Sequence, residues 1–440
     1  MKIGFVSLGC SKNLVDTEVM LKRLADAGYT ITPDETEADI IVVNTCGFIQ
    51  SAKEEAIDNI LDVAWLKKNR ALKGIIATGC LVERYREQVL EEMPEVDAVL
   101  GTGSYHKIVE AVEAVARGEK YASFEDKNAA PLGGERIVTT PPYTAYLKVA
   151  EGCDNRCTYC AIPLIRGRMR SRRMEDVVAE AKSLEKIGVK ELNIIAQDTS
   201  RYGLDLYDKY MLPELVQKIL AETQIPWIRL LYLYPDKITD ELVAVIRDND
   251  RVCKYVDLPI QHVNDTVLAR MNRHGDGAVV RAAVEKIRRE IPGVTLRTTA
   301  IVGFPGETEA QFAELCEFVK ETGFDRFGAF TYSPEEGTPA AEFPDQIDEQ
   351  VKQDRYDTLM AVQLEVSEKK MQEKIGDVIE VLCEGYDPVA GVQYGRSRAD
   401  APDVDGKVYF TSAKKLPEGV SVNVKITKAL DYDLFGEAVR

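Results

Sequence analysis

The stretch EGCDNRCTYCAIPLIRGRMRSRR, residues 151–173, places Cys153, Cys157 and Cys160 in the spacing C-x3-C-x2-C. Structural zinc sites use four ligands, usually in two close pairs, and ferredoxin-type clusters use four thiolates. Three thiolates on a four-iron cluster instead leave one iron open to bind a further ligand. The alternative is that all three are structural residues of a loop. Free cysteines are more often buried than collected in one glycine-flanked loop, so the spacing favours the cluster.

Six predicted strands alternate with helical patterns in this part of the chain. They cover residues 145–152, 191–197, 227–235, 254–262, 294–306 and 325–333. Such alternation indicates a parallel sheet covered by helices, and a closed barrel of this kind needs eight strands. Six units therefore predict an open partial barrel. The cysteine loop follows the first strand, at the strand end where such barrels carry their chemistry.

A second set of three cysteines lies nearer the N-terminus. Strands are predicted there over residues 2–9, 38–45 and 74–79, with helical patterns between them. Cys10, Cys46 and Cys80 each follow one of these strands directly. The carboxyl ends of parallel strands share one edge of a sheet, and nearby helix N-termini favour thiolates. We therefore expect the three thiols to converge on a second open cluster site, with chance placement of loop cysteines as the alternative.

Changes in composition and in the pattern of strands and helices along the chain predict three domains. Residues 1–127 form a parallel-sheet α/β domain, and residues 128–143, rich in Pro, Gly and Thr, form a linker. Residues 144–375 form the open barrel with a long closing helix. From residue 376 to 440, short apolar runs separated by Gly, Pro and Asp predict a small antiparallel β-barrel.

Composition limits the class of protein. The chain has 440 residues, 45% of them hydrophobic, and a formal net charge of −17. Its N-terminal apolar run is too short for a signal peptide, so we expect a cytoplasmic protein whose nine cysteines are reduced. We predict core or incidental roles for Cys253, Cys316 and Cys383. Because the net charge is negative, RNA is a less expected partner than it would be for a protein with a basic surface.

The cysteine spacing and the six-unit barrel resemble the radical S-adenosylmethionine (SAM) enzymes. This resemblance implies a [4Fe-4S] cluster on Cys153, Cys157 and Cys160, whose open iron binds SAM. Tyr159 fills the aromatic position before the third cysteine, which resembles a contact to the adenine.

Three further stretches correspond to SAM-binding positions of the family. IVGFPGET, with Gly303 and Gly306, resembles its glycine-rich strand end near the adenine, and DLPIQH, with Pro259 and Gln261, stands where groups approach the ribose. Plain turn chemistry is the alternative for the glycine-rich stretches. After the second strand the sequence departs from the usual Gly-Gly-Glu, and Gln197 and Asp198 are the residues expected to meet the SAM amino group instead.

Both cysteine sets together with the C-terminal module resemble the methylthiotransferases over essentially the whole chain, with a C-terminal TRAM domain. VSLGCSKNLVDTE, LYLYPDKIT and FTYSPEEGTPAA resemble the branch that modifies ribosomal protein S-twelve. The resemblance implies that –SCH3 replaces a hydrogen on the β-carbon of an aspartate in that protein. It also implies a second [4Fe-4S] cluster on Cys10, Cys46 and Cys80, two SAM molecules, and an electron donor such as flavodoxin or ferredoxin.

Two other functions remain open from the sequence. One is a tRNA adenosine methylthiotransferase, and the other is a non-catalytic iron–sulfur protein. Residues 376–440 hold eight basic and eleven acidic residues, a balance that suits a basic protein partner better than RNA. RNA contact is therefore possible but secondary.

Five arginines follow the cysteine loop, namely Arg166, Arg168, Arg170, Arg172 and Arg173. They either bind the SAM carboxylate or an acidic partner group, or belong to a solvated loop with acidic neighbours in the next helix.

Overall fold

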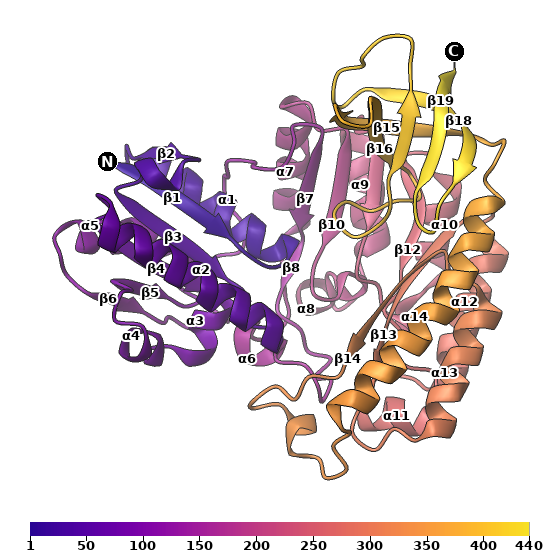
Figure 1. Ribbon diagram of the computed structural model, residues 1–440, viewed down its shortest axis with the longest axis horizontal. Helices are drawn as coiled ribbons and strands as arrows, with labels where there is room; N and C mark the ends of the chain where they lie inside the picture. Colours follow the sequence, from indigo (N-terminus) through magenta and orange to yellow (C-terminus); the bar gives the residue numbers. More distant parts are fainter. Residues whose placement is uncertain (440) are drawn as a thin grey trace.

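The computed structural model describes residues 1–439 and contains three bodies in chain order (Figure 1). The N-terminal body is drawn in indigo and violet, the partial barrel from magenta to orange, and the C-terminal barrel in yellow. Within the described residues, none of the helices combines the length and apolarity needed to cross a bilayer.

The N-terminal body is a parallel sheet of order β2-β1-β3-β4-β5-β6. Its strands are β1 (Lys2–Ser7), β2 (Thr30–Thr32), β3 (Ile40–Thr45), β4 (Gly74–Gly79), β5 (Ala98–Leu100) and β6 (Tyr121–Ser123). Its helices are α1 (Ser11–Asp26), α2 (Gln50–Asn69), α3 (Cys80–Tyr85), α4 (Gln88–Glu92) and α5 (Ile108–Ala116).

Helices cover both faces of this sheet. Ile40 and Val42 of β3 pack with α1 and α5, whereas Ile41 and Val43 pack with α2. Because successive side chains of a strand point to opposite faces, a continuous apolar strand fits a sheet buried on both sides.

The second body is an open parallel sheet of order β14-β13-β12-β11-β10-β7. Its strands are β7 (Thr144–Lys148), β10 (Glu191–Ile195), β11 (Trp227–Leu230), β12 (Val252–Asp257), β13 (Thr295–Val302) and β14 (Arg326–Thr331). The principal outer helices are α7 (Met174–Lys186), α9 (Leu212–Glu222), α10 (Asp240–Asp248), α12 (Gly277–Glu290), α13 (Glu309–Thr322) and the closing helix α14 (Glu349–Gln372). Six strands that do not close confirm the predicted partial barrel.

The concave side of the open barrel is shared by all three bodies. Trp227 and Tyr255 of the barrel strands pack there with Val15 of α1 and Ala401 of the C-terminal body. The open barrel therefore buries its inner face against its neighbours rather than against strands of its own.

The C-terminal body is a closed barrel of order β15-β16-β17-β19-β18. Its strands are β15 (Val378–Asp387), β16 (Val392–Ser397), β17 (Val408–Thr411), β18 (Ser421–Ala429) and β19 (Leu434–Val439). The pairing is antiparallel, as predicted, except that β17 and β19 run parallel. The three predicted fold classes are confirmed.

Candidate active site

The three-cysteine loop projects from a short two-stranded stem at the end of β7. Strand β8 (Ala150–Glu151) pairs with β9 (Arg170–Ser171), and the Cys153 amide donates to the Gly167 carbonyl at 3.2 Å. Gly152 has φ +76°, and a Cβ there would lie 2.0 Å from the Arg168 carbonyl oxygen. The close approach of the two sides of the stem therefore requires glycine at this position.

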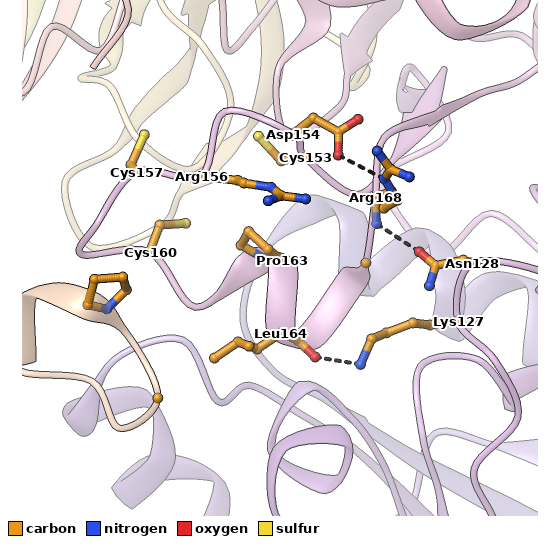
Figure 2. A pocket seen from close by; sticks show the side chains of 13 residues that line it. Lys127, Asn128, Cys153, Asp154, Arg156, Cys157, Cys160, Pro163, Leu164 and Arg168 are labelled. Carbon is orange, nitrogen blue, oxygen red and sulfur yellow. Dashed lines mark hydrogen bonds and ion pairs between the residues drawn. The ribbon is translucent and has the colours of Figure 1, made fainter. Parts of the chain in front are cut away.

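Cys153, Cys157 and Cys160 line one cavity of about 320 Å³. Figure 2 shows Arg156 pointing into the space between the cysteines and Arg168. Arg156 is exposed and has a left-handed φ of +52°, uncommon for a residue with a side chain. The cavity thus combines three thiols with guanidinium groups at its rim.

The donor chemistry of these thiols fits an iron–sulfur cluster. Burial raises the pKa of Cys153 to about 12 and raises that of Cys160 as well, so without metal both are protonated at neutral pH. Cysteine thiols lose their protons when they bind metal and act as thiolate ligands. Within residues 1–439, no three His, Cys, Asp or Glu side chains stand close enough to share one metal ion. A four-iron cluster does not need that arrangement, because each thiolate binds a different iron.

Two residues that the sequence interpretation did not single out surround Cys157. The Tyr234 hydroxyl lies 3.3 Å from the Cys157 Sγ, and the Arg273 guanidinium lies 4.0 Å from the same sulfur. Arg273 also stacks 3.8 Å from the Tyr234 ring centroid and donates to the Pro259 carbonyl at 2.6 Å. Arg273 therefore joins the cysteine loop to the predicted ribose-side stretch.

The predicted SAM contacts near the second strand are held by polar neighbours. Gln197 donates to Glu151 at 2.7 Å, which leaves its carbonyl oxygen without a protein partner. Asp198 is 1% exposed, accepts from Asn155 at 2.7 Å and from Ser200, and burial raises its pKa. The Gln197 oxygen is buried, so contact with the SAM amino group stays a prediction for Gln197 and for Asp198.

Of the remaining predicted SAM contacts, Tyr159 lies in the cysteine loop, and the others follow the carboxyl ends of β12 and β13. Tyr159 packs against the aromatic group around Phe304. Gly303 donates its amide to Glu307 at 2.7 Å, and Gly306 donates its amide to the Asp345 carbonyl at 2.8 Å.

Gln261 has φ +69° and bridges to Ala300, and the Pro259 carbonyl is the one that accepts from Arg273. The two glycine amides already have partners, so turn geometry accounts for both glycines. Contact with SAM remains a prediction for these positions.

The second set of cysteines lies at one edge of the N-terminal sheet. Cys10, Cys46 and Cys80 follow β1, β3 and β4, which are neighbours in the sheet. A Cβ on Gly9 would lie 3.0 Å from the Cys46 Sγ, so the Cys10 loop is folded directly over Cys46. Burial raises the pKa of Cys80 to about 12, opposed by Arg166, and raises that of Cys46.

Arg166, which follows the first set of cysteines in the chain, contacts the second set. It ends helix α6 (Ile162–Arg166) and is 3% exposed. Its Nη2 donates to Cys80 Sγ at 3.4 Å and to Asn13 Oδ1 at 2.9 Å. A residue of the barrel thereby reaches the cysteines of the N-terminal body.

The other arginines of the run have separate roles. Arg170 donates to carbonyls of Lys127 and Ala130 at 2.6 Å each, and Arg172 pairs with Glu180 of α7 at 2.6 Å. Arg168 and Arg173 are exposed. The solvated-loop interpretation therefore fits Arg173. Arg168 lies at the cavity rim, 3.7 Å from Asp154, and the other three are held by protein contacts.

The three remaining cysteines lie outside both sites. Cys253 and Cys383 are buried, and Cys316 is half-buried.

Comparison with protein families divides the chain as its three bodies do. Residues 2–101 match a family described as "Uncharacterized protein family UPF0004", residues 147–319 match the radical SAM superfamily, and residues 375–439 match the TRAM domain. Among solved structures, the radical SAM methyltransferase TsrM from Kitasatospora setae, with tryptophan and a SAM analogue bound, has a TM-score of 0.55 at 14% identity. That likeness covers 92% of this chain and 79% of TsrM, and it concerns the fold alone.

Full-length relatives are far closer in sequence. Proteins from a Thermoanaerobacter species and from Desulforamulus reducens, both named "Ribosomal protein uS12 methylthiotransferase RimO", are each 50% identical over 99% of both chains. The Geobacter sulfurreducens protein of the same name is 50% identical over 100% of this chain and 98% of its own. The chain therefore belongs to the RimO family of radical SAM methylthiotransferases.

Proposed function

We propose that this methylthiotransferase transfers –SCH3 to the β-carbon of an aspartate of ribosomal protein uS12. Full-length similarity to proteins named for that activity supports the substrate. The observation that carries the proposal is that Cys80 of the second set packs against Ala161, the residue after Cys160, and accepts a hydrogen bond from Arg166. Methylthio transfer needs a radical-generating site beside a sulfur-holding one.

A radical SAM enzyme uses SAM and an iron–sulfur cluster, and here we assign that cluster to Cys153, Cys157 and Cys160. We assign a second cluster to Cys10, Cys46 and Cys80. With both bound, the first cluster and SAM would supply the radical that removes the β-hydrogen, and the second would supply the sulfur that replaces it.

The chain's own residues hold and orient these groups. The β8–β9 stem fixes the cysteine loop, while Tyr234 and Arg273 place polar hydrogens beside Cys157. Arg156 and Arg168 at the cavity rim suit a substrate that carries a carboxylate, since guanidinium groups bind carboxylates through paired hydrogen bonds.

Contact with RNA is a secondary part of the proposal. Tyr394, Tyr409 and Phe435 lie on neighbouring strands of the C-terminal barrel, and the last two rings stack at 5.1 Å. Lys407 and Lys428 lie over the outer two rings, at 4.6 and 5.8 Å from their centroids. Aromatic rings flanked by cations can stack on nucleic-acid bases. The excess of acidic residues in this body therefore does not exclude binding of ribosomal RNA beside uS12.

The test is anaerobic reconstitution of the full chain, followed by SAM, dithionite and a uS12 peptide. We expect Cys153→Ala to abolish 5′-deoxyadenosine formation. Cys10→Ala should retain it and lose –SCH3 transfer, whereas Cys316→Ala, outside both sites, should retain both. Liquid chromatography measures deoxyadenosine, and mass spectrometry measures the peptide.

A Cys10→Ala protein that still transfers –SCH3 would overturn the role of the second site. In cells, loss of the modification from tRNA but not from uS12 on deletion of the gene would overturn the substrate.

A further inference from the structure

Arg166 lies in a buried polar network between the two cysteine sites. Its Nη1 contacts Asp16 and lies 3.3 Å from Glu151, and Lys148 binds the same two carboxylates. All four charged residues are at most 7% exposed. Asp16 comes from α1 of the N-terminal body, whereas the other three belong to the barrel.

The network fixes the orientation of the guanidinium group. Two carboxylates balance the two cations and hold Nη1, so Nη2 is directed toward Asn13 and Cys80. Glu151 lies 2.7 Å from the Lys148 ammonium and 3.3 Å from the Arg166 guanidinium, so both cations compensate its buried charge. Glu151 also accepts from Gln197 at 2.7 Å. One connected set of contacts thus runs from Cys80 to the predicted SAM side of the barrel.

We propose that Arg166 is a positioning residue for the N-terminal cluster, to which it presents a hydrogen bond on the Cys80 sulfur. Hydrogen bonds to ligand sulfurs help set the reduction potential of iron–sulfur clusters, and a cationic donor favours the more negative, reduced state. The barrel thereby makes the N-terminal cluster easier to reduce, and does so only when the two bodies are docked. This inference rests on the assignment of Cys10, Cys46 and Cys80 as cluster ligands.

The experiment isolates the N-terminal cluster. The background protein is the full chain carrying Cys153→Ala, Cys157→Ala and Cys160→Ala. It is reconstituted, its iron content is measured, and its midpoint potential is determined by anaerobic redox titration. Arg166→Gln, Arg166→Lys and Arg172→Gln are then added separately. Arg172 is the matched control, since it is a buried arginine of the same run that bonds Glu180 and the Lys148 carbonyl.

We expect Arg166→Gln to lower the midpoint potential at unchanged iron content. Arg166→Lys keeps the charge but not the forked donor, so its midpoint potential should lie between those of Arg166→Gln and the background protein. The midpoint potential of Arg172→Gln should equal that of the background protein. An Arg166→Gln protein with full iron and an unshifted potential overturns the inference and leaves the proposed function standing.

Two further outcomes remain decisive. If the background protein itself binds no iron, the two-cluster assignment fails, and the role of Arg166 fails with it. If Arg166→Gln alone loses the iron, Arg166→Lys decides: a lowered potential supports the inference, and an unchanged one overturns it.

Discussion

Gly9 shows how single residues shape the cysteine sites. Its φ is +82°, and a Cβ there would lie 2.8 Å from the Cys46 Cβ. Neither atom can move without moving the backbone that carries Cys10 or Cys46. Gly9 therefore lets two of the three cysteines approach one another.

Gly9→Ala should disrupt the proposed N-terminal cluster site. Gly28→Ala is the matched control, because Gly28 has a similar φ of +87° but open space around its Cα. A side chain at such a φ costs about 1 kcal/mol in either variant, and only Gly9→Ala adds the clash. Two four-iron clusters contain ~8 iron atoms, so we expect iron per reconstituted chain to fall toward ~4 in Gly9→Ala alone. Equal iron in both variants would contradict the argument.

At the scale of elements, the loop after β14 locks the N-terminal body to the barrel. Glu335 of this loop is 2% exposed and binds Lys53 of α2 at 3.0 Å and Arg84 of α3 at 2.6 Å. Arg84 also donates to the carbonyl of Gly47, the residue after Cys46, at 2.9 Å. The interface contact therefore reaches the edge that carries the cysteines.

Glu335→Gln should loosen this interface. The change leaves Lys53 and Arg84 without their buried carboxylate, a loss that typically costs about 3 to 5 kcal/mol. We expect lower thermal stability and faster proteolysis within residues 128–143. Glu336→Gln changes an exposed neighbouring side chain and should alter stability by less than about 0.5 kcal/mol. Similar proteolysis of the two variants would show that Glu335 does not lock the interface.

Across the whole molecule, a buried ion cluster holds the C-terminal barrel on the partial barrel. Glu191, the first residue of β10, is fully buried and binds Arg229 at 3.0 Å and Arg396 of β16 at 2.6 Å. Burial alone would raise the Glu191 pKa, but the two guanidinium groups hold it at about 2, below its usual 4.5. The charged form is thus the one that the folded protein stabilises.

This pKa predicts a pH dependence of unfolding. Because the folded pKa is depressed, the contribution of Glu191 is complete above pH 4.5 and is lost as pH falls toward 2. At neutral pH we expect Glu191→Gln to lower the free energy of unfolding by about 3 kcal/mol. Urea unfolding of both proteins measures that difference, which should shrink below pH 4.5. Glu380→Gln breaks a partly exposed pair with Arg398 at the same interface and should cost no more than about 1 kcal/mol. A pH-independent difference for Glu191→Gln would contradict the assignment.

The sequence alone determined the parts of this protein that depend on local order. Alternating strands and helices predicted the two parallel sheets, because hydrophobic periodicity and turn residues act over short distances. The edge shared by Cys10, Cys46 and Cys80 followed from the same pattern, since parallel strands present their carboxyl ends together. The C-x3-C-x2-C loop was visible for the same reason.

Only the tertiary structure decided how the bodies meet. Arg166 was one of five arginines in a charged run, and its contact with Cys80 joins residues 86 positions apart. Tyr234 and Arg273 reach Cys157 from 77 and 116 positions away. Such contacts depend on how whole elements dock, which no local pattern specifies. The sequence therefore located the cysteines of each candidate site, and the packing of the three bodies determined which charges surround them.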